Sequence, residues 1–383
     1  MINTSQQTFY RLENLNAEQQ RITYQTSTGK ILEHGSDDST LYAKEVYIDD
    51  KIKTYDGIKL QIQKTTAQNN VADSTIGEIK NLLDVLKTEL LKANTATVGD
   101  EDKKSIAVAI SGLKDNIYAA VNTQVEGEYL FSGSDSSVKS FEKDPTTGVI
   151  SYNGDNLLRK VAVEEGSYRE RGINGFDMLM YNSDIATKAD PNLSFKDSDR
   201  ILDENGNEWK RNGTTLEKYD LEGNLTNPLE SITGLTNDGA TPPTYTAVVG
   251  TPPPDGTRFE TKTNIFGVID DVLNALNKVD SLGNPINDAT ADAILRDSID
   301  KVGDSYDYVN TAHAELGSRN KVLEISLERV NSKLTQFNVL SQELGAADLG
   351  KLAIETKALE LTYTALYSTV NKTNQLSIVN FLK

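Results

Sequence analysis

The sequence predicts an α+β fold: long antiparallel helical rods from both chain ends form a coiled-coil bundle, and a β-rich domain is inserted in the middle. Apolar residues repeat every three and four positions over residues 295–344, and the same spacing returns over 48–90 and 106–120. Such a 3.5-residue period is typical of a coiled-coil seam. All nine prolines lie between Pro145 and Pro285, so only the flanks favour unbroken long helices.

The first 40 residues predict a helix followed by a polar loop. The helical spacing is set by Phe9, Leu12, Leu15 and Ile22. The loop begins near residue 28, and Ser39 or Thr40 is expected to cap the next helix.

Two amino-terminal rods and one carboxyl-terminal rod are expected to bury one another. The first runs over 48–90, a break follows at 98–100, and the second runs over 106–120. The third, 295–344, would be about 75 Å long at 1.5 Å per residue, and its seam is interrupted by His313, Asn320 and Ser341. The two ends of the sequence therefore meet in space, and the middle is an excursion.

Residues 135–259 read as β structure with Asn-Gly turns. A hairpin is predicted around Asn153-Gly154, between strands at 149–152 and 157–163. Further turns are predicted at Asn174-Gly175, Asn205-Gly206, Asn212-Gly213 and Gly223-Asn224. The Pro/Thr/Gly-rich stretch 241–256 is predicted to be an extended surface loop. A helix resumes after residue 265 and breaks at 283–285.

The last stretch is apolar and nearly uncharged, because only Lys372 and Lys383 carry charge after Glu360. Its apolar positions are Leu359, Tyr363, Leu366, Val370, Leu376, Ile378, Phe381 and Leu382. Such a segment needs a partner surface, since a lone helix of this length is marginal in water. We therefore expect these residues, with those of the first helix, to form an assembly interface that folds only on polymerisation.

Composition excludes several classes of function. The net charge of −18 and a pI near 4.7 argue against nucleic-acid binding and against binding to anionic lipid. The absence of cysteine excludes disulfides, thiolate catalysis and Cys-based zinc sites. Neither a signal peptide at the amino terminus nor an apolar run long enough to span a membrane is visible.

The residues that could take part in catalysis or metal binding favour structural roles instead. Two histidines, His34 and His313, cannot supply a zinc or nucleophile constellation, and Asn320 is expected to fix helix register. The acidic pair Asp37-Asp38 favours a solvated or capping role, and the acidic run 203–208 fits a hairpin turn better than a calcium loop. We therefore expect no catalytic, cofactor or metal site, and no enzyme.

Two motifs resemble a known family. The stretch 25–38, with Ser27, Gly29, Lys30, Asp37 and Asp38, is similar to the amino-terminal signature of flagellins and flagellar hook-filament junction proteins. The second motif is more similar to the junction proteins, and consists of Gly127, Tyr129, Leu130, Phe131 and Gly133. The closing residues 376–382 also resemble that family.

The resemblance implies three domains. These are a terminal helical assembly domain (1–40 with 345–383), a helical rod domain (41–135 with 263–344) and an outward β-rich domain (136–262). Residues 182–258 resemble nothing in the family and are expected to be a variable insertion.

The implied role is a structural junction between the hook and the flagellin filament. The implied partners are copies of itself, hook-associated protein 1, flagellin and an export chaperone, and the implied place is the extracellular flagellum, reached through the type III export apparatus. Two alternatives remain: a flagellin or minor flagellin, and an adhesin-like binding module carried by the β insertion.

Overall fold

The computed structural model describes residues 4–95, 99–187, 189–221, 223–239, 243–249 and 259–381, with side chains described between residues 6 and 372. It divides into two compact units, residues 61–325 and residues 1–60 with 326–383. Each unit is taken by itself below. The domain bounds expected from the sequence remain a prediction.

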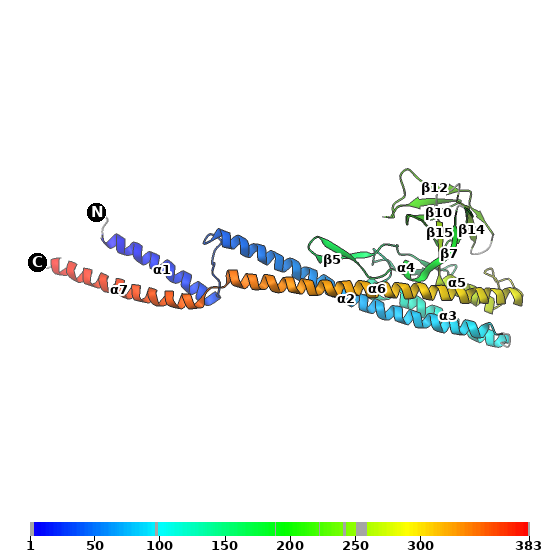
Figure 1. Ribbon diagram of the computed structural model, residues 1–383, viewed down its shortest axis with the longest axis horizontal. Helices are drawn as coiled ribbons and strands as arrows, with labels where there is room; N and C mark the ends of the chain where they lie inside the picture. Colours follow the sequence, from blue (N-terminus) through cyan, green and yellow to red (C-terminus); the bar gives the residue numbers. More distant parts are fainter. Residues whose placement is uncertain are drawn as a thin grey trace. The chain divides into compact units, whose positions relative to one another are not determined.

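In the unit 61–325, long helices carry a β-rich excursion (Figure 1), which confirms the predicted fold class. The helices that contribute to this unit are α2 (Ser39–Ala93), α3 (Asp100–Val121), α5 (Ile265–Leu276) and α6 (Asp288–Gly345). Their apolar core includes the predicted seam positions Ile76, Ile79, Leu83, Leu86, Leu90, Ile110, Ile117, Leu295, Val302, Val309 and Leu316. Each such buried side chain contributes about 1.5–3 kcal/mol of apolar burial.

Two of the three polar interruptions of the seam, His313 and Asn320, have partners on the facing helix. Asn69 Nδ2 donates to Asn320 Oδ1 at 2.6 Å, and Asn69 is buried. His313 Nε2 lies 2.9 Å from Asp73 Oδ1. A partly buried amide pair of this kind forms in one register of the two helices, so this geometry agrees with the register role expected for Asn320.

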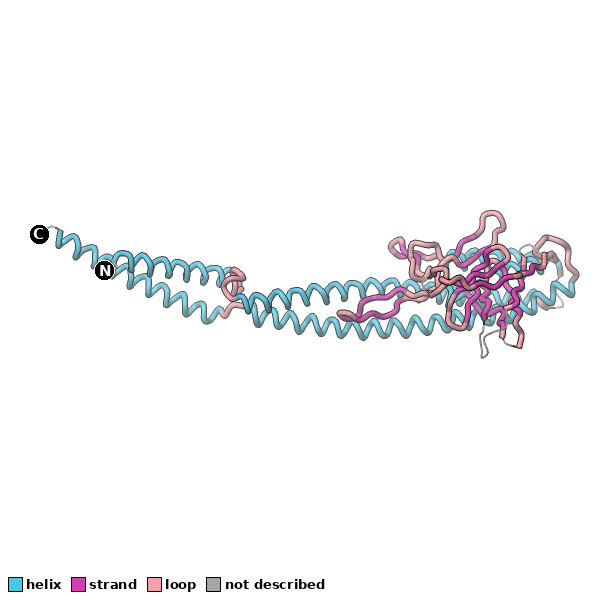
Figure 2. The backbone as a smooth tube through the Cα atoms, turned by 90° about the horizontal axis from the view of Figure 1, so that it is seen from above, coloured by secondary structure: helices cyan, strands magenta, loops and turns pink. Residues whose placement is uncertain are grey.

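The excursion between α3 and α5 holds the strands (Figure 2). A six-stranded sheet has the order β12-β11-β10-β9-β15-β7, a three-stranded sheet has the order β13-β14-β8, and β1-β2, β3-β4 and β5-β6 are hairpins. The strand bounds are β1 Gln124–Val125, β2 Glu128–Tyr129, β3 Phe141–Lys143, β4 Ile150–Tyr152, β5 Arg159–Glu164, β6 Ser167–Arg171, β7 Met180–Ala186, β8 Asn192–Lys196, β9 Arg200–Asp203, β10 Glu208–Asn212, β11 Thr215–Tyr219, β12 Ser231–Thr233, β13 Thr236–Asn237, β14 Thr244–Val248 and β15 Phe259–Asn264. The larger sheets have an apolar core of their own, which includes Phe195, Trp209 and Phe259.

The hairpin predicted at Asn153-Gly154 is wrong, and the turn predicted at Asn174-Gly175 is the start of a helix. Strand β4 pairs with β3, and β5 with β6, so Asn153-Gly154 does not join β4 to β5. A Cβ at Gly154 would lie 2.3 Å from the Ser132 carbonyl oxygen, so this glycine serves close backbone packing. Asn174 begins α4 (Gly175–Leu179), because its Oδ1 accepts the N–H of Asp177 at 2.7 Å.

The three other turn predictions are confirmed. The hairpins β9-β10 and β10-β11 turn at Asn205-Gly206 and Asn212-Gly213, and Gly223-Asn224 lies in the turn after β11. The predicted loop 241–256 is wrong at 244–248, which form strand β14 on β8 because Thr, Tyr and Val suit a pleated surface. Residues 241–242 and 250–256 of that loop lie outside the described residues.

In the other unit, α1 (Thr4–Thr28) and α7 (Leu349–Phe381) lie side by side in both views (Figures 1 and 2). They are antiparallel, since Arg21 pairs with Glu355 at 2.8 Å and Tyr363 Oη donates to Asn16 Oδ1 at 2.6 Å. This pairing within one chain stands against the expectation that both ends fold only in a polymer, which stays a prediction. Each terminal helix gives the other an apolar surface within one chain, which a lone segment lacks.

Candidate assembly surface

The predicted assembly residues mostly line the contact between α1 and α7. Ile22 is buried, and a set of half-buried residues shares its seam: Leu12, Leu15, Leu359, Tyr363, Leu366 and Val370. Their spacing of three, four or seven positions places them on one face of each helix. The sequence pattern therefore found the seam inside the terminal unit.

A second set of large apolar residues on the helix pair is exposed. Phe9, Tyr10, Ile354, Leu361 and Tyr367 are 71, 66, 72, 70 and 60% exposed, respectively. Of these five, only Phe9 was among the predicted assembly residues. We call these five residues the outward face.

The sequence contains a pattern that could have predicted part of the outward face, namely a second apolar stripe on α7. Ile354, Ala358, Leu361 and Ala365 repeat at four, three and four positions, on the side of α7 away from the seam residues, and all four are exposed. Two apolar stripes on different sides of one helix indicate two partners, one on each side. The predicted residues Leu376, Ile378, Phe381 and Leu382 lie outside the residues with described side chains and stay a prediction.

The outward face is apolar and is suited to contact with another helix. From residue 361 to residue 371 the helix α7 carries no charged side chain. Exposed large apolar side chains gathered on one element mark an interaction surface. Within the described residues there is no group of three acidic or histidine side chains that could hold a metal ion.

One ion pair reinforces the seam. Arg21 Nη2 contacts Glu355 at 2.8 Å and Glu18 at 2.7 Å. The hydrogen bond from Arg21 lowers the pKa of Glu355, and the pairs raise the pKa of Arg21. Both groups stay charged at neutral pH, so the pair favours one antiparallel register of α1 and α7.

The signature residues around 25–38 build the connection between the terminal helices and the rods. Gly29 has φ +69°, which ends α1 at Thr28. The N–H of Ile31 donates to the Gly345 carbonyl and the N–H of Ala347 to the Gly29 carbonyl, both at 2.9 Å. Lys30 forms the isolated bridge to Ala346 between these bonds. The two connecting segments are thus tied to each other, as well as to their helices.

The acidic pair of the signature has the structural role that the sequence favoured. Asp38 Oδ1 accepts the N–H groups of Thr40 at 3.0 Å and Leu41 at 2.9 Å, so Asp38 caps α2. The expected caps Ser39 and Thr40 are therefore wrong by one or two positions, as α2 already begins at Ser39. Asp37 Oδ2 accepts the N–H of His34 at 2.9 Å. Nearby, the Ser27 hydroxyl donates to the Tyr24 carbonyl at 3.0 Å.

The second signature builds the base of the β excursion. Glu126 and Gly127 have φ +55° and +80°, the tight turn between β1 and β2 that favours glycine. Leu130 and Phe131 are buried, and the Phe131 carbonyl accepts the Gly175 N–H at 2.7 Å.

Two further residues of this signature fix the chain on either side of that core. The Tyr129 N–H donates to the Ser136 carbonyl at 2.9 Å. At Gly133, with φ +89°, a Cβ would lie 2.7 Å from the Asp155 carbonyl oxygen. All these residues have packing roles, as distinct from the outward face.

No helix in the described part of the chain is sufficiently long and apolar to cross a membrane.

Comparisons with known proteins agree with the sequence resemblance. Residues 2–136 match the model of the bacterial flagellin N-terminal helical region. The chain is 24% identical over 192 residues to flagellar hook-associated protein 3 of Salmonella typhimurium, covering 50% of this chain and 58% of that protein. It is 25% identical over 265 residues to flagellar hook-associated protein 3 of Escherichia coli K12, covering 61% of this chain and 82% of that protein.

A solved structure shares the fold. The crystal structure of flagellar hook-associated protein 3 from Legionella pneumophila aligns with a TM-score of 0.52 and 18% identity, over 78% of this chain and 98% of that one. The match to the Salmonella protein spans little more than half of that relative's length. The resemblance to the junction proteins of the flagellin superfamily is thereby confirmed.

Proposed function

We propose that this relative of the flagellar hook-associated proteins 3, whose residues 2–136 match the flagellin N-terminal helical region, is a structural protein that joins the hook to the flagellin filament. It assembles through its terminal helices. The observation that carries the proposal is the outward face of α1 and α7, where large apolar side chains are exposed on helices already paired through their other face.

The partners follow from this role. They are further copies of the chain, hook-associated protein 1 on the hook side and flagellin on the filament side, with an export chaperone before assembly. The protein acts in the extracellular flagellum and reaches it through the flagellar type III apparatus, without a cleaved signal peptide. Its role is structural, and it carries out no catalysis.

The relatives favour this role over the two alternatives. The two curated relatives and the solved structure described above are all hook-associated proteins 3, rather than flagellins. An adhesin-like role for the β insertion has no observation of its own among the described residues.

The test is complementation of a strain that lacks the gene. Wild-type protein is expected to restore filaments, whereas Leu361→Asp is expected to leave hooks without filaments and release flagellin into the medium. Leu361 is 70% exposed, so the charge spoils burial against a neighbour and leaves the free chain folded.

The matched control is Val108→Asp on α3, where the side chain is 75% exposed on the rod. This variant adds the same charge at similar exposure, and filaments are expected to grow. Normal filaments with Leu361→Asp, in a chain that circular dichroism shows to be folded, would reject assembly through the outward face. A deletion strain that still grows filaments would reject the junction role itself.

A further inference from the structure

The chain contains four Asn-Gly dipeptides, which begin at residues 153, 174, 205 and 212. Asparagine is a thermolabile residue, and a following glycine has no side chain to shield its backbone nitrogen from the asparagine amide carbon. When that nitrogen attacks the amide carbon, the asparagine loses ammonia, a reaction called deamidation. The attack requires an asparagine side chain that can turn and a glycine N–H that is not already held. The fold therefore decides which of the four dipeptides can react.

Two of the dipeptides hold the glycine N–H in a hydrogen bond. At 174–175 it donates to the Phe131 carbonyl at 2.7 Å, and the asparagine is fully buried. At 205–206 it donates to the Asp203 carbonyl at 2.9 Å. Since the attacking nitrogen must first leave its acceptor, both sites react only after the chain opens locally.

A third dipeptide, Asn153-Gly154, is held on both sides. The Asn153 N–H donates to the Ser140 carbonyl at 2.9 Å, and the Gly154 carbonyl accepts a hydrogen bond from Arg200 at 2.6 Å. The close approach of Gly154 to the Ser132 carbonyl restricts the backbone rotation that the attack needs. This site is therefore protected by packing.

The fourth dipeptide, Asn212-Gly213, is open. It lies at the tip of the β10-β11 hairpin, where Asn212 pairs with Thr215, and both of its residues are exposed. Gly213 has φ +62°, at the first of the two turn positions. Such a turn is closed by the N–H of its fourth residue, so the N–H of its second residue is left over. Among the described residues the Gly213 N–H has no hydrogen-bond acceptor, and a Cβ on Gly213 would meet no atom beyond its chain neighbours within 4 Å.

We propose that Asn212 is a deamidation site, at which the folded chain slowly converts the asparagine to aspartate or isoaspartate. The Gly213 nitrogen forms a bond to Asn212 Cγ as the Cγ–Nδ2 bond breaks, and ammonia leaves with the proton of that N–H. Water then opens the resulting five-membered ring at either carbonyl, which restores the N–H and leaves a carboxylic acid. One water enters and one ammonia leaves, so no oxidant or reductant is needed. This inference is independent of the junction role.

The new charge faces another carboxylate. Asn212 Nδ2 donates to Glu217 Oε1 of β11 at 3.0 Å, so the reaction replaces this donor by an anion. Lys210, the cross-strand partner of Glu217, pairs with Glu208 at 3.3 Å. Like charges on facing strands destabilise a strand pair. Deamidation is therefore expected to loosen the end of the hairpin and to add one negative charge to the β insertion.

Peptide mapping by mass spectrometry tests the site in the full-length chain. The folded protein is incubated at mildly alkaline pH, which favours loss of the glycine amide proton. Deamidation is expected at Asn212 at least about tenfold faster than at any of the other three dipeptides, because those must first open locally. In urea, where the chain is unfolded, the four are expected to react within about threefold of one another. The comparison separates protection by the fold from differences in local sequence.

The aspartate product can be made directly by substitution. Asn212→Asp is expected to speed amide exchange of residues 210–217 by about threefold to fivefold, and adding Glu217→Gln is expected to restore the wild-type rate. The matched control is Asn205→Asp at the neighbouring turn. It adds the same charge and is expected to change exchange of 210–217 by less than about twofold.

Two results would overturn the site. One is equal or faster deamidation of another Asn-Gly dipeptide in the folded chain. The other is unmodified Asn212 in the folded chain after the unfolded chain has reacted. Wild-type exchange in Asn212→Asp would reject the charge conflict with Glu217.

Discussion

Removing one seam side chain separates the two accounts of the chain ends, pairing within the monomer or folding only in a polymer. Ile22 on α1 is 5% exposed and belongs to the contact with α7. Truncating a buried isoleucine to alanine costs about 2–5 kcal/mol, from lost burial and the cavity left behind. Two helices that depend on one such seam are marginal without it. Ile22→Ala is therefore expected to release both α1 and α7, while the rod core keeps its stability.

Limited proteolysis and amide exchange of the dilute monomer measure this effect. In wild type both terminal helices are expected to be protected, and in Ile22→Ala both are expected to be cut and to exchange rapidly together. The control is Ile354→Ala on the outward face, where the side chain is 72% exposed and the expected change in stability is within about 0.5 kcal/mol. Unchanged protection in Ile22→Ala would refute the pairing, and so would rapid exchange of both ends in the wild-type monomer.

Three further predictions concern single contacts. Asp38→Ala removes the cap of α2 and is expected to lower the free energy of unfolding, measured by urea titration, by about 1 kcal/mol. Asp38→Asn is expected to keep most of the wild-type stability, because asparagine also caps helices. Equal stability of all three proteins would contradict the capping role. Phe131→Ala empties a fully buried site and is expected to cost about 3–5 kcal/mol by the same titration; a loss under about 1 kcal/mol would show that the signature core is not as packed as described. Because the hydrogen bond from Arg21 lowers the pKa of Glu355 below 4.5, its contribution is present above that value and is lost as pH falls through the lower, folded-state pKa. The helicity of the ends, followed by circular dichroism during acidification, is expected to fall in wild type with a step that Glu355→Gln lacks, and identical curves would count against the pair.

The rods could be predicted from the sequence because their period is local and long. Seam positions such as Leu83 and Leu316 are fixed by spacing alone, and both are fully buried. Turns were predicted less reliably than helices. Asn153-Gly154 and Asn205-Gly206 are the same dipeptide, yet only the second joins two paired strands. Gly154 is needed because the chain there lies close to the Ser132 carbonyl oxygen. The residues next to Gly154 in the sequence do not predict that contact.

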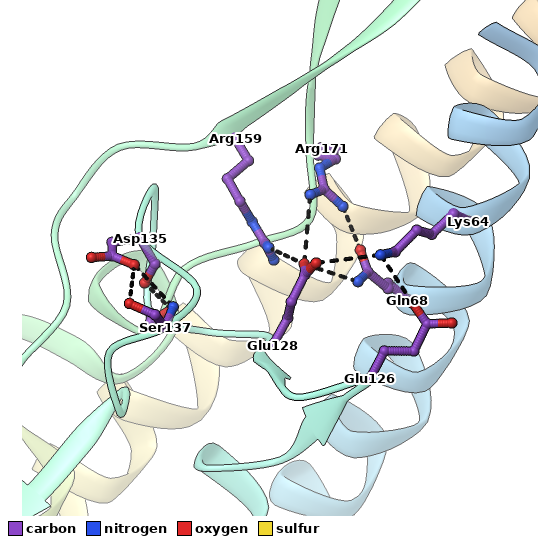
Figure 3. A network of polar contacts seen from close by, with 9 residues as sticks. Lys64, Gln68, Glu126, Glu128, Asp135, Ser137, Arg159 and Arg171 are labelled. Atoms are coloured by element: carbon purple, nitrogen blue, oxygen red, sulfur yellow. Dashed lines mark hydrogen bonds and ion pairs between the residues drawn. The ribbon is translucent and has the colours of Figure 1, made fainter. Parts of the chain in front are cut away.

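How the terminal helices divide their apolar residues between the seam and the outward face was only partly predictable, for a related reason. An apolar stripe shows that a helix face is buried, but does not say against what. Leu359 and Leu366 turned out to face α1, and the free surface belongs to Leu361 and its neighbours. The contacts of Glu128 with Lys64, Arg159 and Arg171 (Figure 3) have no sequence signature, because these residues come from separate elements that only the fold brings together.

The position of the protein in an intact flagellum tests the central claim most directly. The chain has no cysteine, so Leu229→Cys, at a residue in the β insertion that is 52% exposed, gives a single site for a gold label. Electron microscopy of labelled flagella is expected to show one band of gold where hook meets filament. Gold along the whole filament would contradict the junction role and identify a flagellin, and flagella without gold at that boundary would contradict it as well.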